Sequence, residues 1–132
     1  MGTLKEIVFE CDRPATLARF WAQALQGYQI RPYDAAEIAR LAALGLTPET
    51  DPTVLVDGPG PSFCFQRVAG RRYENNRVHV DMAAADVNAE VARLCGCGAT
   101  LQRTAPRYAV LCDPEGNQFC VVADDAYRAG AR

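Results

Sequence analysis

Residues 108–122 read Tyr-Ala-Val-Leu-Cys-Asp-Pro-Glu-Gly-Asn-Gln-Phe-Cys-Val-Val, and this stretch decides the fold. Its two outer runs are rich in β-branched and aromatic residues, which favour strands. Between them, Pro114 presets its φ angle, Gly116 can adopt a positive φ, and the side chains of Asp113 and Asn117 can hydrogen-bond to nearby backbone amides. The stretch therefore predicts a β-hairpin.

A second hairpin is expected in the first half of the chain, where Gly58-Pro59-Gly60-Pro61 separates two apolar runs. Each hairpin comes after a strand and a helix, so the same order of elements occurs twice. Such a repeat indicates an internal duplication. The strands are expected at residues 4–11, 28–31, 53–57 and 62–68 in the first copy, and at 78–82, 99–103, 108–112 and 118–122 in the second.

Each copy is also expected to contain one amphipathic helix. Apolar residues recur at spacings of three and four over residues 15–25, with Asp12 as the expected N-cap and Pro14 as the first helical residue. In the second copy, Asp86 is expected to cap a helix that reaches about Leu94.

Residues 34–51 interrupt the first copy with a short helix, Ala35–Leu44, which Asp34 caps and Gly45 ends. We expect this helical insertion to lie over one end of the sheet. It is either a lid or a surface segment that only covers apolar side chains.

Length and composition are those of an ordinary globular protein. With 132 residues, 49% of them hydrophobic and 23% charged, the chain is expected to form one domain over 1–132, with module one at 1–70 and module two at 77–123. A net charge of −2 gives no basic surface for nucleic acid. No apolar run approaches the ~18 residues of a membrane span, and no export signal is recognised, so no membrane contact and a cytoplasmic location are expected.

The six cysteines are expected to be reduced, because no export signal accompanies them and most lie inside predicted elements or at a helix end. Cys95-Gly96-Cys97 has a spacing found in redox and metal sites, but no further ligands lie nearby in sequence, so a structural role is favoured. Residues 69–77 contain three arginines and are interpreted as a solvated linker rather than an anion site.

The duplication predicts an α+β fold in which two βαβββ modules form a curved, cup-shaped mixed sheet with the helices outside. Polar faces of the strands would then line the cup. Because buried polar groups need partners or a ligand, the cup is the predicted binding site. The residues expected to face it are Glu6, Val8, Glu10, Cys64, Gln66, His79, Asp81, Gln118 and Cys120.

A set of motifs runs in order along nearly the whole chain: Ala18-Arg-Phe-Trp21 with Leu25 and Gly27, Phe65-Gln-Arg-Val68, Arg77-Val-His-Val-Asp-Met82, Gly98-Ala-Thr100 and Asp113-Pro-Glu-Gly-Asn-Gln-Phe-Cys-Val121. Together these motifs resemble the glyoxalase-like branch of the vicinal oxygen chelate superfamily. Members of that superfamily include glyoxalases, extradiol dioxygenases, epimerases, fosfomycin-modifying transferases and bleomycin-sequestering proteins. The resemblance therefore implies a fold but no single function.

The resemblance also implies a test for metal. Catalytic members commonly hold a divalent ion with two histidines and two glutamates, one from the first and one from the last strand of each module. The corresponding positions here are Glu6, Gln66 or a residue near it, His79 and Cys120, and only His79 keeps the usual residue. A hard cation needs carboxylate charge, so no metal cofactor is expected, although His79, Glu6 and Cys120 could still bind zinc.

Two functions follow as hypotheses. In the first, a metal-free cup binds a small organic molecule, such as an aromatic compound or an antibiotic. Its expected contacts are Gln66, Asp81, Cys120 and Cys64, with Trp21 and Phe65 as flanking apolar surface, unless Trp21 is a core residue. In the second, a lyase, isomerase or dioxygenase-type enzyme uses His79 and Glu6 as catalytic residues with an altered metal site that could include Cys120 and Gln66.

Other interpretations of the same residues stay open. His79 could be a neutral imidazole that is hydrogen-bonded within the cup, or a metal-free acid or base. Cys120 could be a small wall residue or a reactive thiol. A third function, an interaction module that uses its sheet edges, would leave the cup empty. Because members of the superfamily often pair modules between chains, the resemblance implies a homodimer.

Overall fold

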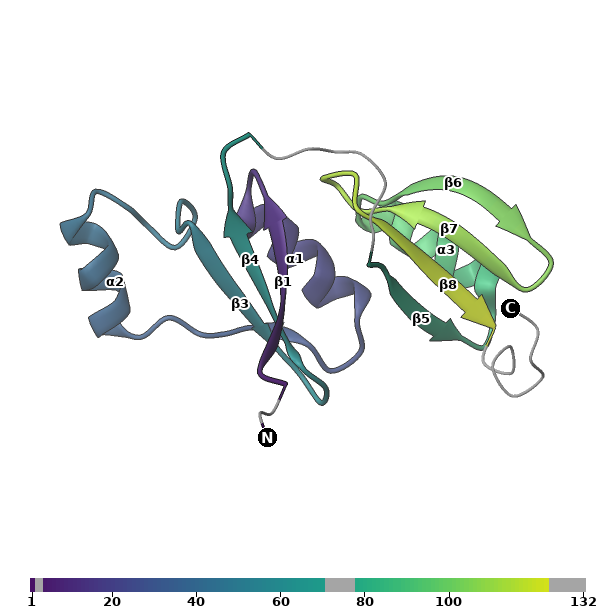
Figure 1. Ribbon diagram of the computed structural model, residues 1–132, viewed down its shortest axis with the longest axis horizontal. Helices are drawn as coiled ribbons and strands as arrows, with labels where there is room; N and C mark the ends of the chain where they lie inside the picture. The colour runs from purple at the N-terminus through teal and green to yellow at the C-terminus, as the bar shows by residue number, and fades with distance from the viewer. Residues whose placement is uncertain (2–3, 71–77, 124–132) are drawn as a thin grey trace. The chain divides into compact units, whose positions relative to one another are not determined.

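The computed structural model describes residues 1, 4–70 and 78–123 and contains two compact units, residues 1–71 and 72–132 (Figure 1). Each unit contains one four-stranded mixed sheet. The predicted α+β class with two βαβββ modules is therefore confirmed. The expected linker residues 71–77 and the tail from residue 124 lie outside the described residues.

The two sheets have the same topology. In the first, the strand order is β1-β4-β3-β2, and in the second it is β5-β8-β7-β6. The first and last strands of each unit are parallel, and the other pairs are antiparallel. The first unit consists of β1 (Glu6–Cys11), α1 (Pro14–Ala24), β2 (Gln29–Ile30), α2 (Ala35–Ala43), β3 (Thr53–Asp57) and β4 (Ser62–Arg67). The second consists of β5 (Val80–Ala84), α3 (Val87–Cys97), β6 (Thr100–Ala105), β7 (Tyr108–Cys112) and β8 (Gln118–Ala123).

The N-cap of α1 is Arg13, which corrects the expectation of Asp12. Pro14 is the first helical residue, as predicted. A residue that precedes proline is restricted to extended backbone, and Arg13 has φ −129° and ψ 82°. Pro14 therefore makes the preceding residue, Arg13, the N-cap, one residue later than the sequence pattern indicated.

An aromatic core lies between α1 and one face of the first sheet. The ring centroid of Phe9 on β1 lies 5.5 Å from that of Trp21 on α1 and 5.3 Å from that of Phe65 on β4. Tilted aromatic pairs at such distances contribute about 0.5–1.5 kcal/mol each beyond the burial of their area. These contacts pack α1 against one face of the sheet. The opposite face is not covered by α1.

The helical insertion begins as predicted. Asp34 caps α2 by accepting a hydrogen bond from the Glu37 backbone N–H at 2.8 Å, and Gly45 follows the helix with φ +74°. Leu41 is the buried residue of α2, whereas Leu44 at its end is largely exposed. Much of the apolar surface of this helix thus remains outside the core.

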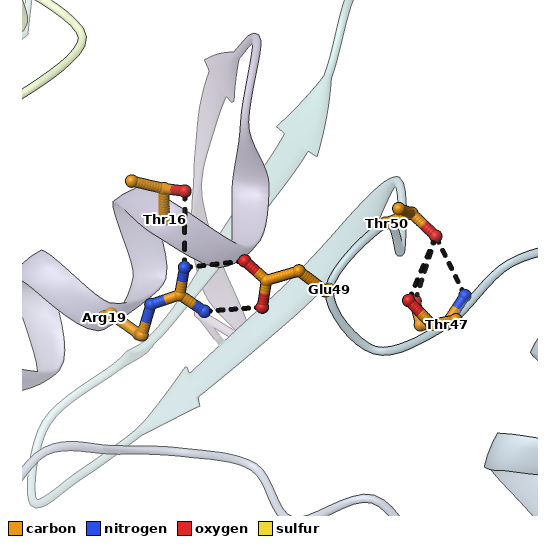
Figure 2. A network of polar contacts seen from close by, with 5 residues as sticks. All are labelled: Thr16, Arg19, Thr47, Glu49 and Thr50. Atoms are coloured by element: carbon orange, nitrogen blue, oxygen red, sulfur yellow. Dashed lines mark hydrogen bonds and ion pairs between the residues drawn. The ribbon is translucent and has the colours of Figure 1, made fainter.

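An ion pair connects the loop after α2 to α1 (Figure 2). The Arg19 guanidinium on α1 donates to both carboxylate oxygens of Glu49, at 2.8 Å and 2.7 Å, and also to the Thr16 hydroxyl at 3.4 Å. In the same loop, the Thr47 backbone N–H donates to the Thr50 hydroxyl at 2.8 Å. A bidentate guanidinium–carboxylate pair has a defined geometry, so it sets the position of this loop even though exposed ion pairs add little stability.

The predicted turn at residues 113–117 closes the last hairpin of the second unit. Asp113 is buried, and its Oδ1 accepts from the backbone N–H groups of Glu115 and Asn117, both at 2.9 Å. Its Oδ2 accepts from the Asn117 side-chain amide at 2.8 Å, and Gly116 has φ +84°. The turn fixes the first pair of the hairpin, Cys112 opposite Gln118.

Two boundaries in the second unit differ from the sequence prediction. β5 begins at Val80, so His79 lies just before the strand rather than inside it. The helix α3, which Asp86 caps as predicted, continues to Cys97 and is ended by Gly98 at φ +121°. Gly96 is therefore a helical residue. None of the six cysteines, all of which are described, forms a disulfide. The described part of the chain contains no helix with the length and apolar character needed to cross a membrane.

Candidate functional site

Each sheet has one face against its helix and an opposite face, which we call the distal face. In the first unit, Phe9 and Phe65 are register partners that face α1. The equivalent pair in the second unit is Met82 and Val121, which therefore lie on the α3 side. Because side chains alternate along a strand, Asp81, Cys120 and Val122 occupy the distal face of the second sheet.

Three predicted site residues meet on this distal face. The Nε2 atom of His79 lies 3.2 Å from Oδ1 of Asp81, and the nitrogen, oxygen and sulfur atoms that His79, Asp81 and Cys120 could offer to a metal all lie within 4.8 Å of one another. The strand register explains this, because Asp81 is opposite Cys120 and His79 is two residues before Asp81. The side chains of His79 and Asp81 are 42% and 14% exposed and Cys120 is 9% exposed, so the group lies at the border between solvent and interior.

An apolar cluster adjoins these three residues. Val110, Cys120 and Val122 are buried together, and the partly buried Tyr108 packs against them. The Arg103 guanidinium donates to the Tyr108 hydroxyl at 3.2 Å and lies 5.7 Å from the centroid of its ring. The sequence analysis did not include Tyr108, Val110 or Val122 in the site. The hairpin register was the available signal, because it pairs Val110 with Cys120 and Tyr108 with Val122.

The register of the first unit shows which of its residues correspond to this group. Val8 is opposite Cys64 in the way that Asp81 is opposite Cys120. Glu6 is therefore equivalent to His79, whereas the equivalent of Cys120 is Cys64 and not Gln66. The sequence analysis placed that position on Gln66 or a residue near it, and Gln66 lies two residues beyond Cys64 along β4.

Cys64 differs from Cys120 in its surroundings. Burial, and then the negative charge of Glu6, raises the pKa of the Cys64 thiol above its ordinary value of 9.0. A raised pKa disfavours the thiolate, which is the form of cysteine that binds metal. The first unit also has the apolar Val8 where the second has Asp81.

Trp21 and Phe65, expected to flank a ligand, are fully buried in the core of the first unit. Both belong to the aromatic group between α1 and the sheet, which satisfies the alternative considered for Trp21. Both side chains lie on the α1 side of the first sheet, opposite to its distal face. We therefore leave both residues out of the site.

A charged network at one end of the first sheet was missed by the sequence analysis. Arg31 Nε and Nη2 donate to the two carboxylate oxygens of Asp57 at 2.7 Å and 2.9 Å, and the Ser62 hydroxyl donates to Asp57 at 2.6 Å. The hydrogen bonds from Arg31 and then Ser62 lower the pKa of Asp57 from 3.8 to about 2. Asp57 therefore stays ionised throughout the neutral range.

The helical insertion borders the first sheet at a cavity of about 290 Å³. Leu41 of α2 and Leu44, which follows the helix, line it together with Leu55 of β3. Leu55 is opposite Cys64 and so belongs to the distal face. Nearby, the Tyr33 hydroxyl donates to Oδ2 of Asp51 at 2.7 Å. The insertion thus lies beside the distal face, and its action as a lid stays a prediction.

The donor atoms of the group on the second sheet decide which metal could fit there. Calcium and magnesium take oxygen ligands, so they are poorly matched by an imidazole and a sulfur. Nitrogen, carboxylate oxygen and thiolate sulfur together suit zinc. The residues of this group do not fit a hard cation, but they fit a borderline-soft transition ion.

Comparison with known proteins gives one family and many similar structures. Residues 6–122 match a family described as a glyoxalase-like domain. A glyoxalase/bleomycin resistance protein/dioxygenase family enzyme from Burkholderia phytofirmans is 14% identical, with a TM-score of 0.69 over 92% of this chain and 98% of that one. A genomically encoded fosfomycin resistance protein from Listeria monocytogenes is 12% identical, with a TM-score of 0.68 over 100% and 99% of the two chains.

A trypanothione-dependent glyoxalase I from Leishmania major is 16% identical, with a TM-score of 0.65 over 99% of this chain and 93% of that one. No curated protein gives a significant match to the sequence. At such identities, the similar structures show the fold alone.

Proposed function

The chain belongs to the glyoxalase-like domain family, within the vicinal oxygen chelate superfamily, and from that premise we propose that it binds a small organic molecule on the distal face of its second sheet. The roles expected for Glu6, Cys64 and Gln66 stay predictions, as does the single domain over 1–132. A homodimer and a cytoplasmic location also stay predictions.

The observation that supports this proposal is the apolar cluster with polar groups on either side of it. Val110 and Val122 form a buried apolar floor. The half-exposed His79 and the mostly buried Asp81 stand on one side of it, and Tyr108 carries the hydroxyl that Arg103 contacts. Small-molecule sites are mostly apolar with a few placed polar groups that fix orientation. The proposed ligand accordingly has an aromatic or branched apolar body and at least one polar group that reaches His79.

Known relatives suggest the first probes. Similar structures are named for fosfomycin resistance and for a family that includes bleomycin resistance proteins. Fosfomycin, bleomycin and a library of small aromatic acids therefore form the starting panel. This choice rests on fold-level analogy, which is why the panel is broad.

Methyl NMR of the full chain tests the proposal at the level of residues. The probes are added in the presence of EDTA, so that binding does not depend on metal. We expect the Val110 and Val122 methyl signals to shift in a saturable way. The methyl signals of Val54 and Val56, buried in the first unit, serve as the matched control and should not shift. Shifts in both pairs, or in neither with any probe of the panel, would contradict the proposed site.

The second candidate function is a metal-dependent enzyme of the lyase, isomerase or dioxygenase type. The meeting of His79, Asp81 and Cys120 favours it, because these donors could hold a metal ion. A metal bound there would act as a Lewis acid toward an oxygen of the substrate. Elemental analysis separates the two functions: a stoichiometric metal that is lost in His79→Ala would favour the enzyme. Absence of metal from the purified protein, with ligand binding retained, would favour the binding protein.

A further inference from the structure

We propose that His79, Asp81 and Cys120 form a zinc-type metal site that lies entirely within the second unit. This site would supply the metal of the second candidate function, and its test does not depend on whether an organic molecule binds. It also differs from the metal site that the sequence resemblance implied, which drew ligands from both modules. Asp81 takes the place that Glu6 had in that expectation.

The spacing of the three donor atoms is close to that of a formed zinc site. Zinc bonds of about 2.0–2.3 Å in tetrahedral arrangement put neighbouring ligand atoms roughly 3.3–3.6 Å apart. The His79 and Asp81 atoms are already 3.2 Å apart, and no pair among the three exceeds 4.8 Å. Closing the remaining gap requires rotation of side chains rather than movement of the strands, because Asp81 and Cys120 are fixed opposite each other by the sheet.

Burial supports the same assignment. Asp81 and Cys120 are held in a largely dry environment, where the attraction between a cation and its ligands is only weakly screened. His79 is much more exposed, so one side of the site stays open to solvent. Three protein ligands with one open position are typical of catalytic zinc sites, whereas structural zinc sites use four.

The first unit has the same fold without these ligands. Its equivalent positions are Glu6, Val8 and Cys64, so it lacks the carboxylate in the middle of the group. Cys64 lies at the same place on its strand as Cys120 and is buried to a similar degree. The chain therefore contains a matched cysteine that should not bind the ion.

Cobalt(II) titration of the metal-free full chain tests the site, because cobalt replaces zinc and absorbs light when a thiolate binds it. We expect one cobalt per chain, with a thiolate-to-cobalt charge-transfer band that excess zinc removes. Cys120→Ala should abolish the band, whereas Cys64→Ala should keep it at full strength. Asp81→Asn should weaken cobalt affinity at least about tenfold.

The proposal is overturned if wild-type protein gives no charge-transfer band, or if the band survives Cys120→Ala. A band that disappears in Cys64→Ala as well would also refute it. Should Cys120→Ala fail to fold by circular dichroism, Cys120→Ser keeps the size of the side chain and is expected to bind cobalt without the band. Because ligand binding is measured in EDTA, failure of the metal site and failure of the proposed function are distinguished.

Discussion

Replacement of Asp113 by alanine tests whether the turn at residues 113–117 fixes the last hairpin of the second sheet. The carboxylate of the buried Asp113 accepts hydrogen bonds from the backbone N–H groups of Glu115 and Asn117 and from the Asn117 side-chain amide. Alanine would leave these donors without their acceptor. Water can reach the Glu115 N–H, which is only partly buried, but the two bonds from Asn117 are buried.

The expected cost follows from the two buried bonds. A hydrogen bond to a charged group contributes about 1.5–3 kcal/mol, so their loss should lower the free energy of unfolding by about 3–6 kcal/mol. Domains of this size have only about 5–15 kcal/mol in total. Urea unfolding, followed by circular dichroism, measures the difference between Asp113→Ala and wild type.

Asp86→Ala is the matched control for this experiment. Asp86 is an exposed N-cap whose carboxylate accepts a hydrogen bond from the Ala89 backbone N–H at 3.0 Å, and the loss of this cap should cost about 1 kcal/mol. If Asp113→Ala costs no more than Asp86→Ala, the side chain of Asp113 does not fix the hairpin.

Two further predictions concern substitutions at Gly58 and Gly96 and the titration of the Asp57 carboxylate. A Cβ atom at Gly58 would lie 2.5 Å from ring atoms of Tyr28, so Gly58→Ala should destabilise the protein by about 1–3 kcal/mol. Gly96 lies in α3 with open space around it, so Gly96→Ala should stabilise the protein by up to ~1 kcal/mol. Thermal melts of both variants check this, and equal effects would contradict it. The lowered pKa of Asp57 gives stability that is fully present above the ordinary value of 3.8 and is lost as the pH falls toward about 2. Between about pH 5 and about pH 2.5, the urea midpoint of wild type should therefore fall more than that of Asp57→Asn, and parallel decreases would argue against the Arg31 pair.

Much of the fold could be predicted because its signals are local. The turn at residues 113–117 and the cap at Asp34 both depend on side chains that bond to backbone groups within four residues. The amphipathic pattern of α1 likewise depends on neighbours within one or two turns. The predicted N-cap of α1, Asp12, was wrong by only one residue for the same reason, because Pro14 fixes the start of the helix locally.

The site was predicted less completely. His79, Asp81 and Cys120 were each proposed to face one side of their strands, and the structure brings them together. Trp21 and Phe65 could not be assigned, because an aromatic residue on a helix or strand has the same local pattern whether it faces a core or a ligand. Val110 and Val122, which belong to the proposed binding site, were not predicted, since apolar strand residues carry no chemical signal of their own.

The sequence by itself determined that one folding unit occurs twice and where its turns fall, because turn chemistry and periodicity are properties of neighbouring residues. Only the tertiary structure decided that Asp81 lies opposite Cys120. It also decided that Cys64, rather than Gln66, is the residue of the first unit that corresponds to Cys120. The physical reason is strand register. Pairing joins segments that are far apart in the chain, and a shift of one residue would move every side chain of a strand to the other face.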